Sequence, residues 1–145
     1  PYNTITKAGK QMKEDSIAIT AHKNSIANAM AGNKEQWLEL FDNEAVVYDP
    51  VGPSGHDPEG QGFRGIDQIN KFWDLMIAPG NITVVPHKRI RCGDKIVAVV
   101  MTVTNLAGTL KTFTEMVGVY EVNDAGKITV LKVYWDVDAL MEQLP

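Results

Sequence analysis

The sequence predicts an α+β domain in which helices cover one face of a curved, mostly antiparallel sheet. Apolar residues recur at spacings of three and four up to about residue 41 and again over 66–76, as in amphipathic helices. From residue 82 onward the chain is rich in Val, Ile and Thr and is divided by short turns, as in consecutive antiparallel strands. Between the two helical regions, half of the positions in 50–65 are Gly or Pro, which favours a functional loop.

The first half of the chain is expected to form three helices and one short strand. Helices are predicted over about 12–31, 34–41 and 66–76, and the first is broken by Gly32 and Asn33. A short strand over 45–48 is expected to deliver Asp49 into the loop.

The second half divides into four strands and a last helix. The turn signals place the strands at about 82–91, 95–105, 110–122 and 127–136. Because the turns between them are short, we expect antiparallel hairpins. Asp136 is then expected to cap a short helix that carries Val137, Leu140 and Met141.

Successive side chains of a strand point to opposite faces of the sheet, and in each of these strands one face is more apolar than the other. Small helical residues, Ser25 and Ala29, are expected to oppose that face, and the space between them would then form a pocket. Ordinary close-packed core is the alternative for each residue. The strand residues predicted to face the pocket are Met101, Val103, Thr114, Met116, Gly118, Leu131, Val133 and Trp135.

Composition excludes several classes of protein. The 145 residues include 14 basic and 18 acidic side chains, which gives a net charge of −4 and no basic face for nucleic acid. A single cysteine, Cys92, excludes a disulfide framework and a cysteine-rich zinc site. No apolar stretch reaches the roughly 18 residues of a membrane span, and the polar N-terminus lacks a signal pattern. We therefore expect one cytoplasmic domain over 1–145, with 1–11 as a flexible or extended arm.

No metal or cofactor is expected. The three histidines, His22, His56 and His87, are widely separated, and His56 with Asp57 in the loop would need a third ligand from elsewhere.

Four segments together carry a family resemblance: WLELF at 37–41, AVVYDPVG at 45–52, FRGI at 63–66 continuing to FW at 72–73, and NDAGKI at 123–128. In these segments the chain resembles the ketosteroid isomerase family, a SnoaL-like branch of the nuclear-transport-factor-like superfamily. The resemblance implies a cone-shaped α+β barrel that encloses an apolar pocket. It also implies a homodimer formed through the outer face of the sheet. Function does not follow from this fold, because it supports many chemistries.

The resemblance places the family's general base at Asp49. Partial desolvation at the mouth of an apolar concavity would raise the pKa of this carboxyl group toward a useful value. A simple turn role is the alternative, since Asp before Pro is common in turns.

The rest of the family's site is not matched. Its oxyanion hole is a tyrosine and a protonated aspartic acid, and these positions correspond here to Ser25 and Gly118. Losing one such donor costs about 2.7–4 kcal/mol of barrier, so fast steroid isomerisation is placed in doubt. Glu115 is expected to point away from the pocket, unless the register slips by one residue. The replacement donors or other polar residues considered are Ser25, His22, His56, Trp73, Asn105 and Thr114.

Two functions from different classes remain at this point. One is an isomerase, or a related lyase, dehydratase or cyclase, in which Asp49 moves a proton next to a carbonyl in a steroid-like or polyketide-like substrate. The other is a non-catalytic binding protein for a lipophilic small molecule. The epoxide hydrolase branch is set aside because Val99, Met101 and Val133 stand where that branch has an Asp/Arg/Asp set.

Overall fold

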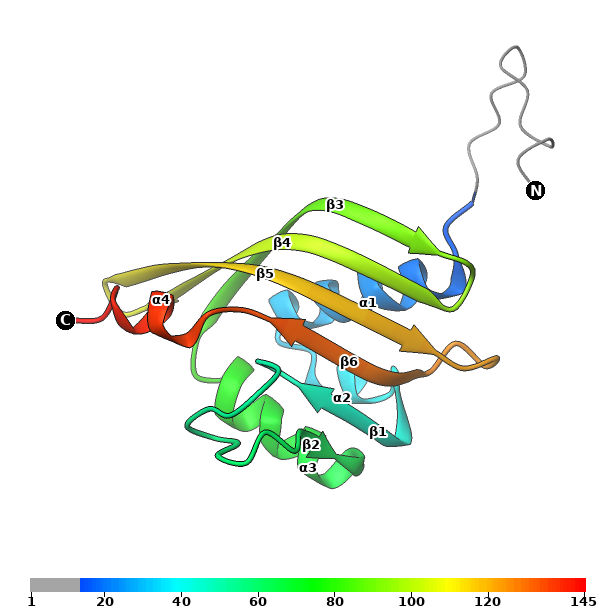
Figure 1. Cartoon of the computed structure of the whole chain (residues 1–145), viewed down its shortest axis with the longest axis horizontal. Helices are drawn as coiled ribbons and strands as arrows, with labels where there is room; N and C mark the ends of the chain where they lie inside the picture. The colour runs from blue at the N-terminus through cyan, green and yellow to red at the C-terminus, as the bar shows by residue number, and fades with distance from the viewer. Residues whose placement is uncertain (1–13) are drawn as a thin grey trace, which may run out of the picture.

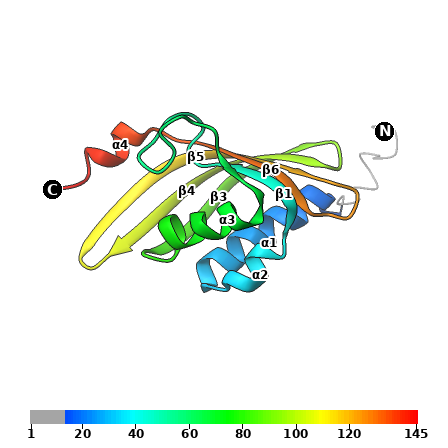
Figure 2. The ribbon, with the colours of Figure 1, turned by 90° about the horizontal axis from the view of Figure 1, so that it is seen from below.

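The computed structural model describes residues 14–145 and confirms the α+β prediction. Three helical segments pack against the concave side of one curved sheet, and Figure 2 shows the sheet wrapping around them. The elements are α1 Ile17–Ala31, α2 Lys34–Leu38, β1 Phe41–Tyr48, β2 Phe63–Arg64, α3 Gly65–Phe72, the π-helical turn η2 Trp73–Ile77, β3 Asn81–Cys92, β4 Ile96–Ala107, β5 Leu110–Val122, β6 Ile128–Tyr134 and α4 Val137–Met141.

The sheet has the order β2-β1-β6-β5-β4-β3 (Figure 1). All neighbouring strands are antiparallel except β1 and β6, which pair in parallel with Val47 opposite Leu131. Because parallel strands end at the same edge, the residues that follow β1 and β6 lie side by side. The predicted hairpins of β3, β4, β5 and β6 are confirmed.

The helix α1 begins later than the sequence suggested. Ser16 has an extended backbone, and its hydroxyl accepts a hydrogen bond from the N–H of Ile19 at 3.1 Å, so it is the N-cap. Residues 14–16 are therefore outside the helix. Residues 12–13 of the predicted helix and the predicted arm over 1–11 lie outside the described residues.

The second predicted helix was too long, and the strand after it too short. α2 ends at Leu38, and Phe41 already belongs to β1, where it pairs with Ile128. The ring of Phe41 packs on that of Trp37 with centroids 4.5 Å apart. The spacing of these two aromatic residues resembled one face of a helix, but the chain turns between them.

The third helix differs from the prediction at both of its ends. The two-residue strand β2 precedes α3 and pairs with β1, inside the stretch predicted to be a structureless loop. At its C-terminal end the helix widens into the π-helical turn η2. The last helix is confirmed, because the Asp136 carboxylate accepts the N–H of Asp138 at 3.0 Å.

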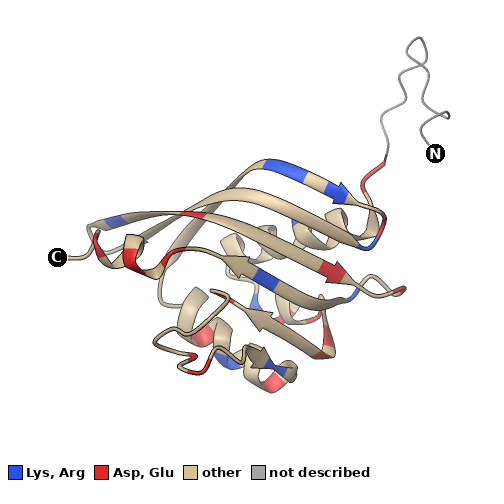
Figure 3. Cartoon of the chain, viewed as in Figure 1, with Lys and Arg blue, Asp and Glu red and all other residues tan. Residues whose placement is uncertain are grey.

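Acidic and basic residues are interspersed over the described chain (Figure 3). One short basic segment lies near the end of β3, where Lys88, Arg89 and Arg91 follow one another. None of the described helices has the length and apolarity needed to cross a bilayer.

Candidate functional site

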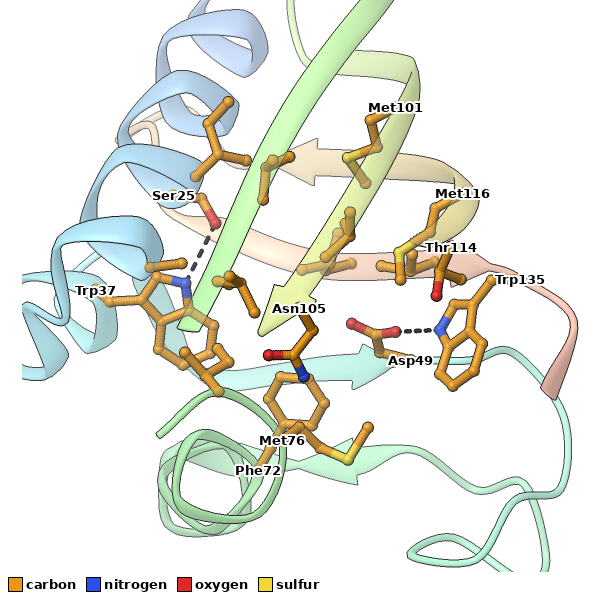
Figure 4. Close-up of a pocket in the computed structure, with 18 of the residues that line it drawn as sticks. Ser25, Trp37, Asp49, Phe72, Met76, Met101, Asn105, Thr114, Met116 and Trp135 are labelled. Carbon is orange, nitrogen blue, oxygen red and sulfur yellow. Dashed lines mark hydrogen bonds between the residues drawn. The ribbon is translucent and has the colours of Figure 1, made fainter. Parts of the chain in front are cut away.

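A cavity of about 180 Å³ lies between the concave face of the sheet and the helical segments, with lining residues from α1, α2, α3, η2 and α4 (Figure 4). Most of its lining is aliphatic, aromatic or thioether, so it favours a lipophilic ligand. The lining residues with a polar atom are Ser25, Trp37, Asp49, Asn105, Thr112, Thr114, Tyr120 and Trp135.

Asp49 is held at this cavity by the parallel pair of strands. It follows the last residue of β1, and two residues later the N–H of Val51 donates to the carbonyl of Val133 at 2.8 Å. Trp135 follows β6 at the same edge of the sheet, and its indole N–H donates to Asp49 Oδ1 at 2.5 Å. Figure 4 shows one carboxylate oxygen directed to Trp135 and the other facing the cavity.

The surroundings make Asp49 a stronger base than an ordinary carboxylate. Burial among apolar side chains disfavours the charged form and raises the pKa from 3.8 to about 7, although the hydrogen bond from Trp135 opposes this. A carboxyl group with a pKa near 7 is partly ionised at neutral pH and can both accept and return a proton.

Eleven of the residues predicted for the pocket line this cavity. They come from the helix α1, the end of β1, and the strands β4, β5 and β6, so segments distant in sequence converge here. They are Ser25, Ala29, Asp49, Met101, Val103, Asn105, Thr114, Met116, Leu131, Val133 and Trp135. Glu115 lies between two of them and faces the opposite side of the sheet, as the period-two pattern predicts.

Trp73 does not line the cavity. Its ring is buried against that of Trp37, with centroids 5.2 Å apart. Met76 and Ile77 line the cavity from the same turn. The wider π-helical turn changes which side chains face inward, compared with the regular helix that the sequence spacing predicts.

Gly118 is also absent from the lining. A Cβ there would lie 2.8 Å from Met101 Cε, so the methionine methyl fills the space where a side chain from residue 118 would start. The position that the family resemblance assigns to an aspartic acid is therefore filled by a thioether from β4.

The two histidines considered as polar site residues lie elsewhere. His22 is fully buried behind the cavity, and its ring packs on Tyr120 with centroids 4.8 Å apart. Neither of its ring nitrogens has a hydrogen-bond partner among the described residues. His56 is exposed in the loop, next to the bridge between Ser54 and Asp57. Residues 14–145 contain no group of three metal-ligating side chains placed to bind an ion.

Asn105 is fixed in one orientation at the cavity wall. Its Oδ1 accepts the backbone N–H of Asn81 at 3.1 Å, which leaves the amide N–H groups as the donors available to a ligand. A Cβ at Gly80 would lie 2.3 Å from this oxygen, so only glycine leaves room for the carboxamide.

Sequence reasoning missed Tyr120, which lines the cavity from β5. The signal was present, because Tyr120 continues the period-two face that carries Thr114, Met116 and Gly118. Phe72, Met76 and Ile77 were missed as lining residues because they depend on how α3 and η2 lie against the sheet.

Comparison with protein families gives a match to the SnoaL-like domain over residues 24–131. The chain belongs to the SnoaL-like family. This confirms the resemblance on which the expected cone-shaped fold rested. Comparison with curated protein sequences gives no match.

Solved structures of the same fold include proteins that bind or act on steroids. Rv0760c from Mycobacterium tuberculosis is 29% identical, with a TM-score of 0.84 over 88% of this chain and 97% of that one. That protein has also been crystallised in complex with estradiol-17β-hemisuccinate; this second structure is 28% identical, with a TM-score of 0.82 over 86% of this chain and 98% of that one. The Δ5-3-ketosteroid isomerase from Mycobacterium sp. is 30% identical, with a TM-score of 0.81 over 86% of this chain and 96% of that one.

Proposed function

We propose that this SnoaL-like protein is an enzyme in which Asp49 acts as a general base next to a carbonyl group of a lipophilic substrate. The observation that carries this proposal is the carboxylate itself. Its pKa is raised to about 7 in an apolar cavity, and one of its oxygens is held by Trp135. A base of this strength suits proton abstraction near neutral pH.

The proposed reaction is a proton transfer between two carbons. The carboxylate of Asp49 takes a proton from the carbon beside the carbonyl, and the C–H electron pair becomes the carbon–carbon double bond of an enolate. The carbonyl π electrons move onto oxygen. In a β,γ-unsaturated ketone this enolate is conjugated with the β,γ double bond. When the carbonyl re-forms, a double bond forms between the α and β carbons, and the former β,γ π electrons take the proton from the Asp49 carboxyl group at the γ carbon.

The substrate class follows from the lining and from the relatives. Most of the cavity lining is apolar, which favours a lipophilic, steroid-like or polyketide-like carbonyl compound. One structural relative is a ketosteroid isomerase, and another has been crystallised with a steroid ester. The same first step on a β-hydroxy ketone would lead to loss of water, which is the lyase version of the proposal.

The experiment is turnover of 5-androstene-3,17-dione, a β,γ-unsaturated ketone, followed by the ultraviolet absorbance of the conjugated product. Asp49→Asn should lower kcat by about 10²-fold to 10⁴-fold, because it removes the base. Glu115→Gln makes the same chemical change on the outer face of the sheet and should leave kcat unchanged. Wild-type turnover by the Asp49→Asn variant would refute the proposal.

A binding protein without catalysis is the second candidate. It is favoured by Ser25 and Gly118, which stand where the ketosteroid isomerase resemblance expects the oxyanion pair. Saturable binding of testosterone with no turnover of β,γ-unsaturated or β-hydroxy ketones would establish this candidate over the enzyme.

We also propose that two copies associate through the outer face of the sheet. Val100, Val117 and Tyr134 form a row across β4, β5 and β6 and are 39%, 39% and 45% exposed. A standard interface buries about 800 Å² on each partner. Light scattering at micromolar concentration should give twice the chain mass of 16.0 kDa, and Val117→Glu should halve it. A wild-type mass of one chain would contradict the proposal.

A further inference from the structure

Tyr120 brings a phenol hydroxyl to the cavity from the middle of the sheet. It lies on β5, opposite Val97 of β4 and Leu131 of β6, and only 3% of its surface is exposed. Its ring rests on that of His22, with centroids 4.8 Å apart. A buried hydroxyl of this kind is costly unless it has a hydrogen-bonding role.

The hydroxyl of Tyr120 is a hydrogen-bonding neighbour of Ser25. Ser25 is itself buried, and its Oγ accepts the indole N–H of Trp37 at 3.3 Å. Since an indole N–H can only donate, the serine proton is left to donate onward to the oxygen of Tyr120. The proton of Tyr120 is then available to a ligand in the cavity that Ser25 and Tyr120 both line.

The strand register places this donor close to Asp49. Tyr48 pairs with Lys132, so Asp49 is level with Val133, which pairs in turn with Gly118. Tyr120 is two residues further along β5 on the same face, a step of about 7 Å along the strand. The negative charge of Asp49 contributes to the raised pKa of Tyr120, as expected for two groups that line the same cavity.

Two small residues make room for this arrangement. Ser25 has only a hydroxymethyl group facing Tyr120. A Cβ at Gly118 would lie 3.4 Å from Tyr120 Cε1, and closer still to Met101. Small residues therefore stand at the two positions where the ketosteroid isomerase resemblance expects a tyrosine and an aspartic acid, and Met101 of β4 and Tyr120 of β5 occupy the space next to Gly118.

We propose that Tyr120 donates a hydrogen bond to the carbonyl oxygen of the substrate and to the enolate oxygen formed from it, with Ser25 and Trp37 as positioning residues. This inference rests on the proposed function, because the enolate forms only when Asp49 takes the proton from the neighbouring carbon. Tyr120 keeps its own proton throughout. Burial raises its pKa above the usual value, so it is a neutral donor at physiological pH.

The kinetic test uses 5-androstene-3,17-dione as the probe. Tyr120→Phe should lower kcat by about 10²-fold to 10³-fold with a much smaller change in KM, since the bond strengthens as charge builds on oxygen. Tyr134→Phe removes a phenol hydroxyl from the outer face of the sheet, where the proposed dimer contact lies, and should leave both constants unchanged because that face is on the other side of the sheet from the cavity. Ser25→Ala should lower kcat less than Tyr120→Phe, and Ser25→Thr, which keeps the hydroxyl, should restore it.

A spectroscopic test separates this inference from the proposed function. Testosterone has one conjugated ketone, and its ¹³C-labelled carbonyl stretch falls in frequency when a donor binds the oxygen. The carbonyl frequency of testosterone should fall when it binds to the wild type or to Asp49→Asn. It should not fall when testosterone binds to Tyr120→Phe. An identical stretch in the wild type and Tyr120→Phe, or no saturable binding of testosterone, would overturn the role of Tyr120. Unchanged turnover in Asp49→Asn, with the Tyr120 effect still present, would instead refute only the general base.

Discussion

Replacing Asp49 by Asn should make the protein more stable at neutral and alkaline pH. The folded protein holds the Asp49 proton up to a pKa of about 7, whereas the unfolded chain releases it near 3.8. Between these values the folded state binds more protons, so the free energy of unfolding falls as the pH rises. Asn carries no charge, and its Oδ1 can still accept the hydrogen bond from Trp135.

The size of the effect follows from the pKa values. One pKa unit corresponds to 1.36 kcal/mol, so ionising Asp49 in the folded protein costs about 4 kcal/mol. Relative to the wild type, Asp49→Asn should therefore gain about 4 kcal/mol between pH 4 and pH 8. Above pH 8 the difference should stay constant, because both folded and unfolded Asp49 are then ionised.

His22 has the opposite effect on the free energy of unfolding in part of this pH range. Burial, with the charges of Arg89 and Lys23, lowers its pKa from 6.5 to about 4. The unfolded chain then binds more protons between pH 4 and pH 6.5, and stability rises with pH by about 3 kcal/mol. The two groups oppose each other in the wild type, so each variant should uncover the slope of the other.

The assay is urea unfolding followed by tryptophan fluorescence at a series of pH values. Asp49→Asn should become more stable from pH 4 to pH 6.5, and His22→Phe should become less stable over the same range. Wild-type and Asp49→Asn stabilities that run parallel from pH 4 to pH 8 would refute the raised pKa and the reasoning built on it.

Two further predictions concern packing around the cavity, and a third concerns the N-cap of α1. Gly118→Ala should lower the unfolding free energy only slightly, because the atom it meets is the terminal methyl of the flexible Met101 side chain, which can turn aside, and combining it with Met101→Ala should cost less than the sum of the two variants. Gly80→Ala should be destabilising in the wild type but nearly neutral when Asn105 is also changed to Ala, as thermal unfolding would show. Ser16→Ala should lower the unfolding free energy by about 1 kcal/mol through loss of the N-cap of α1, and an unchanged value would contradict that role.

The strands and their faces could be predicted because period two and the turn signals are local properties. Thr114 and Met116 face the cavity and Glu115 faces away, as the alternation required. Asp49 could be placed at the pocket because the short strand before it was recognised and the family motif marked its position.

What could not be predicted depends on contacts distant in sequence. The parallel pairing of β1 with β6 brings Trp135 to Asp49 across 86 positions, and no local pattern indicates it. Trp73 begins the π-helical turn, and its ring packs on that of Trp37 in α2, a contact that the local spacing of apolar residues does not indicate. Tyr120 was within reach of the strand pattern, but its partnership with Ser25 required the position of α1 on the sheet.

Hydrogen exchange at carbon is the most direct measurement of the central claim. Testosterone incubated with the protein in D₂O should gain deuterium at the γ carbon of its enone, whose proton the base removes to form the dienolate, as measured by mass spectrometry. The wild type should exchange at least about 10²-fold faster than Asp49→Asn. Equal exchange in the two proteins, at the rate of the buffer alone, would contradict the claim that Asp49 removes a proton from carbon.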